Sequence, residues 1–226
     1  MPGYKVLPVA DLFSLAGRVA VVTGGSGALG SAMAAALIDA GATVGVLARD
    51  RGRLEATVAA IGGAAFVLEA DVLDQASLER ARDAVIERHG RLDVIVNAAG
   101  GNLNVSSLAA GPALTRVGGY GAAKAAIENL TRWLAVDLAQ RYGDRLRVNA
   151  IAPGFVVGEQ NRALLLYENG ELTARGRSVV VRTPSGRLGE PADLVTTLLW
   201  LCSPASRFVT GVVVPVDGGF SAWSGV

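Results

Sequence analysis

The chain has 226 residues, of which 51% are hydrophobic and 18% are charged, and its 21 basic and 20 acidic side chains give a formal net charge of +1. This length indicates one domain with a substantial core, and the balanced charge excludes the basic surface typical of nucleic-acid binders. One cysteine and one histidine cannot supply a disulfide framework or the usual ligands of a zinc site. No apolar run is long enough to span a membrane and no signal peptide is evident, so we expect a cytoplasmic protein with no metal site.

Short apolar runs alternate with helical patterns along nearly the whole chain. This alternation is typical of βαβ units, whose parallel strands form a sheet that is buried on both faces. Strands are expected at residues 19–22, 43–48, 65–70, 92–97, 146–151 and 212–216, and helices at 31–40, 54–61, 75–89, 120–141 and 191–202. We therefore predict a single α/β domain over residues 1–226, built on one doubly wound, Rossmann-type parallel sheet.

The pattern breaks after the strand expected at residues 92–97. The next strand-like residues, 103–106, follow within a few positions. Parallel neighbours need a crossover of a dozen or more residues, which residues 100–102 cannot provide. We expect the domain to lack one helix and most of one strand after residue 100. Residues 103–106 should then form only a stub, with a groove below it where the helix at 120–141 is under-packed.

A glycine-rich sequence at residues 23–30 lies between the first strand and the first helix. Glycines at this corner let the backbone approach a pyrophosphate, and the helix N-terminus offers free N–H groups and the positive end of its dipole. A tight strand-to-helix turn with no ligand is the alternative. The residues predicted to contact a dinucleotide here are Thr23, Gly24, Ser26, Gly27, Leu29 and Gly30.

The second predicted strand ends at Ala48, which is followed by Arg49 and Asp50. In a dinucleotide-binding fold this position faces the adenosine ribose, where an arginine suits the 2′-phosphate of NADP and a carboxylate suits the 2′-hydroxyl of NAD. We predict NADP(H) in preference to NAD(H), with Arg49 on the phosphate; in the alternative, Arg49 is solvated and Asp50 binds the ribose. Asp71 and Val72 end the third strand and could flank the adenine, although Asp71 could equally cap the next helix.

Tyr120 and Lys124 are four residues apart in a predicted helix and therefore share a face. A free phenol has a pKa of about 10 and is a poor acid at neutral pH, but a nearby ammonium favours the phenolate. The pair is a candidate proton donor to a carbonyl oxygen, although a single Tyr-x-x-x-Lys also occurs by chance. Ser107, thirteen residues before Tyr120, could hold the same oxygen with its hydroxyl.

Together these residues resemble the short-chain dehydrogenase/reductase family from Arg18 onward. The stretch at 23–30 is similar to the family's Thr-Gly-x-x-x-Gly-x-Gly motif, with its middle glycine shifted to Gly27. Four further matches are the Asn-x-Ala-Gly of residues 97–100, the spacing of Ser107, Tyr120 and Lys124, the Asn-x-x-x-Pro-Gly of 149–154, and the Asp-Gly-Gly of 217–219. Within the family, residues 158–162, residues 172–176 and the C-terminal residues 219–226 most resemble members described as D-mannonate or fructuronate oxidoreductases.

The resemblance implies hydride transfer between C4 of a nicotinamide and a secondary alcohol or ketone carbon. In that reaction Tyr120 would shuttle the proton, Lys124 would also bind the nicotinamide ribose, and Ser107 would orient the substrate oxygen. It also implies a homodimer or homotetramer. The further cofactor contacts that it implies, besides Tyr120 and Lys124, are Asn97, Ala98, Gly100, Pro153, Gly154 and Val156.

Residues 155–189, which cover the substrate in the family, contain five arginines and three glutamates. A guanidinium binds a carboxylate through two parallel hydrogen bonds, and Gln160 and Asn161 suit sugar hydroxyls. We predict a small-molecule substrate of the sugar-acid type, with Arg162 as first candidate anchor and Arg175 as second. A solvated basic loop is the alternative.

Two functions compete at this point. Retention of Ser107, Tyr120 and Lys124 favours an NADP(H)-linked oxidoreductase. The missing segment favours a catalytically inactive dinucleotide-binding homologue with an internal deletion, because a sheet without one of its strands loses core and exposes an edge. Neither nucleic acid nor a membrane is expected as a partner.

Overall fold

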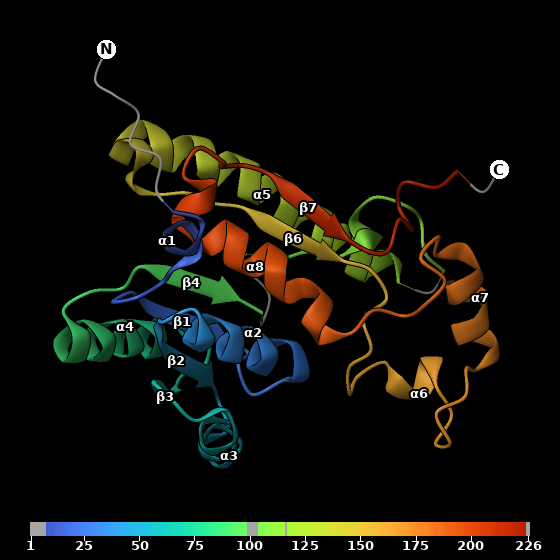
Figure 1. The fold of residues 1–226 in the computed structure, drawn as a ribbon, viewed down its shortest axis with the longest axis horizontal. Helices are drawn as coiled ribbons and strands as arrows, with labels where there is room; N and C mark the ends of the chain where they lie inside the picture. The colour runs from blue at the N-terminus through green and yellow to red at the C-terminus, as the bar shows by residue number, and fades with distance from the viewer. Residues whose placement is uncertain (1–7, 99–103, 116, 225–226) are drawn as a thin grey trace.

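A computed structural model describes residues 8–98, 104–115 and 117–224 of the chain. Its centre is a seven-stranded sheet in the order β3-β2-β1-β4-β5-β6-β7 (Figure 1). Every neighbouring pair is parallel, which confirms the predicted doubly wound sheet. The strands are β1 (Val19–Thr23), β2 (Thr43–Ala48), β3 (Ala65–Glu69), β4 (Val94–Asn97), β5 (Asn104–Val105), β6 (Ala150–Pro153) and β7 (Val213–Val216).

Eight α-helices are assigned in the described residues, and they include all the predicted ones. They are α1 (Val9–Phe13), α2 (Ala28–Asp39), α3 (Arg51–Ile61), α4 (Gln75–His89), α5 (Gly118–Tyr142), α6 (Arg162–Leu165), α7 (Ala174–Arg182) and α8 (Val195–Cys202). The helix expected at 191–202 begins as a 3₁₀ turn over Pro191–Leu194 and becomes α-helical at Val195. The short helices α1, α6 and α7 were not predicted.

Helices cover both faces of the sheet. On one face α2 and α8 lie side by side (Figure 1) and pack on alternate strand residues such as Val22, Val46 and Ile151. On the other face α4 packs against Phe66 and the neighbouring residues of β1–β3. This two-sided burial explains why the strands are continuous apolar runs. Among the residues that the structure describes, no helix combines the length and hydrophobicity that a bilayer crossing requires.

The strand at the predicted break is a stub. β5 contains only Asn104 and Val105, and it pairs with β4 at one position and with β6 at two, whereas β1 and β2 pair at five. The short β5 also explains an error in the predicted start of β6. That strand was expected at 146–151 but begins at Ala150, where its pairing with Asn104 begins.

The long helix α5 is poorly covered. Of its 25 residues only Thr131 and Ala135 are buried, while Leu130, Trp133 and Val136 are 47%, 61% and 58% exposed. Within the described residues, neither hydrophobic cluster includes a residue of α5. We therefore find the under-packing that was predicted for this helix.

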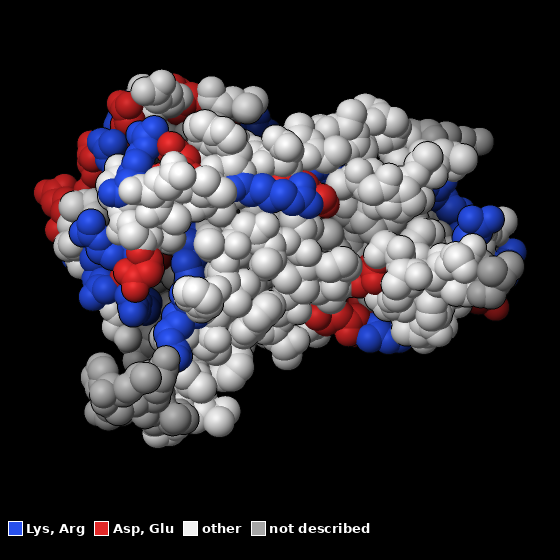
Figure 2. All heavy atoms as spheres, turned by 90° about the horizontal axis from the view of Figure 1, so that it is seen from above, with Lys and Arg blue, Asp and Glu red and all other residues white. Residues whose placement is uncertain are grey.

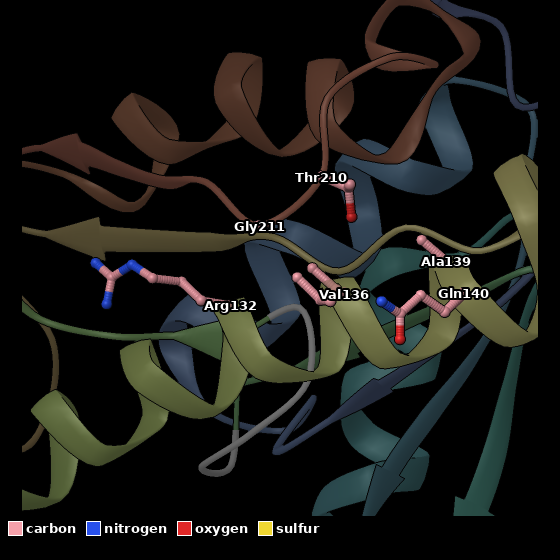
Figure 3. A pocket seen from close by; sticks show the side chains of 7 residues that line it. Arg132, Val136, Ala139, Gln140, Thr210 and Gly211 are labelled. Atoms are coloured by element: carbon pink, nitrogen blue, oxygen red, sulfur yellow. The ribbon is translucent and has the colours of Figure 1, made fainter.

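A hollow of about 510 Å³ lies along the second half of α5, on the C-terminal side of Thr131 (Figure 3). It lies between the second half of α5 and the turn before β7, and its lining residues are Arg132, Ala135, Val136, Ala139, Gln140, Thr210 and Gly211. From above, the molecule carries few charged side chains over a broad central area, with most of the charges gathered toward one end (Figure 2).

Candidate active site at the carboxyl edge of the sheet

A cleft of about 1120 Å³ opens at the carboxyl ends of the strands. Its walls come from the loops after β1, β2, β3, β5 and β6 and from the first turns of α2, α3 and α5. The strand order reverses between β1 and β4, so the cleft lies at the position where open α/β sheets bind their ligands.

In the glycine corner between β1 and α2, the backbone of the loop packs closely against α2 and β2. Gly24 has a φ of +64°, and a Cβ on Gly25 would lie 2.6 Å from a methyl carbon of Val46. A Cβ on Gly30 would lie 2.3 Å from the carbonyl oxygen of Gly24. The helix α2 then begins after Gly27 with no side-chain cap. Its first N–H groups therefore face the cleft and fit a pyrophosphate.

The structure places two predicted cofactor residues behind the cleft rather than in its lining. The Thr23 hydroxyl donates to the Asn97 side-chain oxygen at 3.2 Å, and both residues are buried. This hydrogen bond ties the carboxyl end of β1 to that of β4, so both residues support the cleft from below. Gly100, the third predicted contact in this region, lies outside the described residues.

The segment after β2, where the adenosine is predicted to bind, contributes two arginines and an aspartate to the cleft lining. The Asp50 carboxylate accepts from the backbone N–H of Arg53 at 3.0 Å and thereby caps α3, which commits one of its oxygens. Arg49 is exposed in the cleft wall, and no ion pair joins it to an acidic side chain of the described residues. Arg53 lies 3.6 Å from Glu159, which follows β6.

Asp71 and Val72 also line the cleft, as predicted for the adenine end. Asp71 accepts from the backbone N–H of Leu73 at 3.0 Å. The alternative role of Asp71 as the cap of α4 is wrong, because Asp74 accepts from the Ala76 N–H and occupies the N-cap position.

Ser107, Tyr120 and Lys124 line the same cleft. The Lys124 ammonium donates to the carbonyl oxygen of Val105 at 2.7 Å and lies 5.5 Å from the centre of the Tyr120 ring. Burial of the side chain lowers the pKa of Lys124. The Ser107 oxygen accepts from the Ala109 N–H at 3.2 Å, which leaves the hydroxyl proton for a ligand.

The loop after β6 contributes the predicted substrate side of the cleft. Gln160, Asn161 and Arg175 line the cleft, whereas Arg162 begins α6 and is not part of the lining. The Asn161 amide is committed to its own loop, since it donates to the Val156 carbonyl and accepts from the Gly158 N–H, both at 2.8 Å. Of the two predicted anchors, Arg175 is therefore the one that lies in the cleft lining.

The other predicted cofactor residues line the cleft: Gly24, Ser26, Gly27, Leu29, Gly30, Ala98, Pro153, Gly154 and Val156. Sequence reasoning missed the apolar part of the wall, formed by Leu114, Phe155, Leu164 and Leu165. Their signal is weak: Phe155 directly follows the Pro-Gly pair, and the two leucines belong to a four-residue helix. In the described part of the chain, no three His, Cys, Asp or Glu side chains gather as a metal site requires.

Comparison with known proteins identifies the family. The "short chain dehydrogenase" model matches residues 18–103 and the "Enoyl-(Acyl carrier protein) reductase" model matches residues 99–221. The chain belongs to the short-chain dehydrogenase/reductase family, whose members are oxidoreductases. It is 38% identical to the uncharacterized oxidoreductase UxuB of Bacillus subtilis, over 94% of this chain and 98% of that protein.

The comparison with UxuB also bears on the predicted break. The two sequences align over 275 positions, although this chain has only 226 residues, so the alignment includes a gap on the side of this chain. The two family models meet at residues 99–103, which is where the spacing argument places the missing helix and strand.

Solved structures of the family share the fold closely. A gluconate 5-dehydrogenase from Burkholderia cenocepacia, in complex with NADP and tartrate, gives a TM-score of 0.85 at 28% identity and covers 96% of this chain and 100% of that chain. A Haemophilus influenzae protein provisionally named D-mannonate oxidoreductase, with bound NAD, gives 0.84 at 29% identity over 97% of this chain and 100% of that chain. The family therefore supports a nicotinamide cofactor of either kind.

Proposed function

We propose that this protein is an NADP(H)-linked oxidoreductase that interconverts a ketone and a secondary alcohol on a polyhydroxy carboxylate such as a sugar acid. The observation that carries the proposal is one cleft that contains the glycine corner, the trio of Ser107, Tyr120 and Lys124, and the side chain of Arg175. A bound nicotinamide would supply or accept the hydride.

The chain's own residues supply position and proton transfer. In the direction of reduction, the Tyr120 phenol donates its proton to the oxygen of the substrate carbonyl, while the Ser107 hydroxyl donates a hydrogen bond to the same oxygen. The Lys124 ammonium, fixed by the Val105 carbonyl, places a positive charge near the Tyr120 ring. That charge favours the phenolate that remains after the proton has left.

The residues present fit a dinucleotide. A Cβ on Gly25 or Gly30 would collide with neighbouring atoms of the corner, and the uncapped helix end offers N–H donors to a pyrophosphate. The preference for NADP(H) rests on Arg49, which has no partner among the described residues, and on Asp50, which already caps α3. The gluconate 5-dehydrogenase structure was solved with NADP, which is consistent with this preference.

The substrate assignment rests on Arg175, which lies in the cleft lining at the start of α7. No ion pair joins Arg175 to a described acidic residue, so its guanidinium is free to bind a carboxylate in the cleft. Gln160 in the same wall offers an amide to hydroxyl groups. Arg175→Ala should raise KM for a keto-acid substrate and leave KM for a neutral ketone unchanged.

The cofactor preference is tested with Arg49→Ala. Loss of a charge-assisted hydrogen bond of about 1.5–3 kcal/mol predicts roughly 10- to 150-fold weaker NADPH binding, whereas NADH binding should change little. Fluorescence titration with both cofactors measures the two dissociation constants. Equal affinity of the parent protein for NADPH and NADH would remove the basis for the preference.

The chemistry is tested with Tyr120→Phe, which keeps the ring and removes the proton. The variant should retain NADPH binding and lose about 10²- to 10⁴-fold in turnover, the usual contribution of one acid–base group. Wild-type turnover by this variant would show that another group donates the proton. A parent protein that binds NADPH but converts no ketone or alcohol would instead favour an inactive homologue.

A further inference from the structure

Two hydrogen bonds between side chains join the β5 stub, taken here as residues 104–106, to α5, in addition to the bond from Lys124 to the Val105 carbonyl. The Ser106 hydroxyl donates to a carboxylate oxygen of Glu128 at 2.9 Å, and the Asn104 amide nitrogen donates to the Thr131 hydroxyl. Asn104, Ser106 and Thr131 are buried, and the Glu128 side chain is only 19% exposed. Both bonds are therefore made where water does not compete freely for the same groups.

Few backbone pairings fix the stub in the sheet. Its backbone pairs once with β4 and twice with β6, and the Ser106 N–H extends the second ladder by a bond to Ile151 at 2.7 Å. A strand of normal length is held in register by many such bonds and by its buried face. In β5, Val105 alone faces the α2 and α8 cluster, so the bonds to α5 provide a large share of the restraint.

This stub carries two of the groups that the proposed reaction uses. The Val105 carbonyl receives the Lys124 ammonium at 2.7 Å, and Ser107 follows Ser106 directly in the chain. Lys124 and Glu128 lie one helical turn apart on α5. A displacement of the stub relative to α5 would therefore move the Ser107 hydroxyl away from Tyr120 and loosen Lys124 at the same time.

We propose that Glu128 and Thr131 are positioning residues, which hold the β5 stub against α5 and so align Ser107 and Lys124 with Tyr120. The effect on turnover rests on the proposed function, but the effect on the stub does not. Glu128 contributes most, because its ionised carboxylate makes the stronger kind of hydrogen bond. Its second oxygen faces Arg132 at 3.5 Å on the exposed side.

The first test compares three variants on α5. Glu128→Ala removes the acceptor of the Ser106 hydroxyl, whereas Glu128→Gln keeps an oxygen at the same place. Asp137→Ala is the matched control, because it removes an i,i+4 ion pair with Arg141 from the same helix and does not touch the stub. A displacement of about 1 Å can cost on the order of 10²-fold in rate.

We therefore expect Glu128→Ala to lower kcat by roughly 10- to 100-fold, with a smaller change in KM for NADPH. Glu128→Gln should restore most of the loss and Asp137→Ala should behave like the parent. An equal loss in Glu128→Ala and Asp137→Ala would overturn the proposal, because it would reflect only the loss of an ion pair from the helix. If Glu128→Ala does not fold, Thr131→Val and Thr131→Ser provide the same comparison at the second bond.

A double-mutant cycle with Ser107 separates positioning from a general loss of stability. If Glu128 acts by placing Ser107, part of its effect is already absent in a Ser107→Ala background. Glu128→Ala should then lower kcat less in that background than in the parent. Full additivity of the two losses would overturn the claim that Glu128 acts by placing Ser107.

Hydrogen exchange supplies a readout that needs no turnover. Glu128→Ala and Thr131→Val should speed amide exchange in residues 104–107, including the Ser106 N–H that bonds to Ile151, and leave β1 and β2 unchanged. If the parent lacks oxidoreductase activity but the stub exchanges faster in the two variants than in the parent, the proposed function is refuted and the positioning role is kept. Unchanged exchange in both variants would refute the positioning role, whatever the activity.

Discussion

Gly30 is the point where α2 approaches the loop after β1 most closely. A Cβ at this position would lie 2.3 Å from the carbonyl oxygen of Gly24 and 2.8 Å from the Cα of Gly25. Both are backbone atoms, so no side-chain rotation relieves the contact and either the loop or the helix must move. Gly30→Ala is therefore a direct test of the packing that forms the cofactor corner.

The size of the effect follows from the distances. An ordinary contact begins at 3.4 Å, so α2 and the loop must separate by roughly 1 Å, and overpacking of this kind costs about 1–3 kcal/mol. In a chain of this size about 1 kcal/mol corresponds to roughly 2–4 °C in Tm. We expect the unliganded Gly30→Ala variant to melt roughly 2–12 °C below the parent. Its NADPH affinity should fall about tenfold or more, because the N–H donors of α2 are displaced.

The assay is thermal unfolding of the unliganded protein by circular dichroism, followed by fluorescence titration with NADPH. Gly27→Ala is the matched control, since a Cβ there meets only the Gly24 oxygen at 3.4 Å and its backbone is extended, with φ −88°. Its melting temperature should equal that of the parent. If Gly30→Ala melted within a degree of Gly27→Ala and bound NADPH normally, the packing argument for this corner would be refuted.

Three further predictions concern stability and association. The two hydrogen bonds of 2.7 Å that Arg187 donates lower the pKa of Asp193 to about 2. Their stabilising effect is therefore fully present above the unfolded pKa of ~3.9 and is lost as pH falls through 2, so Asp193→Asn should lower the urea midpoint at pH 7 but not near pH 2. Gly154→Ala should lower Tm, because its Cβ would lie 2.6 Å from the Cα of Asp217; an unchanged melt would contradict this contact. Trp133→Lys should reduce self-association measured by light scattering, and an unchanged mass distribution would exclude this exposed face of α5 from an oligomer interface.

The regular part of the fold could be predicted because each parallel strand is buried on both faces and therefore leaves a continuous apolar run in the sequence. The break after residue 97 was also predictable, since the crossover length of parallel strands is a geometric requirement. The start of β6 was not predictable, because the residue at which a strand begins depends on where its neighbour begins to pair. Here the pairing of β5 with β6 starts at Asn104 and Ala150. The helix α6 contains four residues, which is too short for a helical period to show.

The candidate site was predictable where its chemistry is local in sequence. Tyr120 and Lys124 share a helix face at a spacing of four residues, and the glycine corner is contiguous. Contacts that depend on topology were not predictable: the Ser106 bond to Glu128 spans 22 residues, and its existence depends on how a two-residue strand sits on a helix. The role of Asn161 was not predictable either. Its amide was predicted to bind sugar hydroxyls, but in the structure it makes two hydrogen bonds to the backbone of its own loop.

The ion pair between Arg53 and Glu159 joins the first turn of α3 to the loop after β6, so two separate walls of the cleft are held together by one contact of 3.6 Å. Both side chains are exposed, and dissolved ions therefore screen their attraction. A phosphate bound beside Arg49 would compete with Glu159 for the Arg53 guanidinium and release the loop that carries Gln160. Departure of the dinucleotide should consequently quicken with ionic strength, while the rate of a proton transfer inside the cleft should change little.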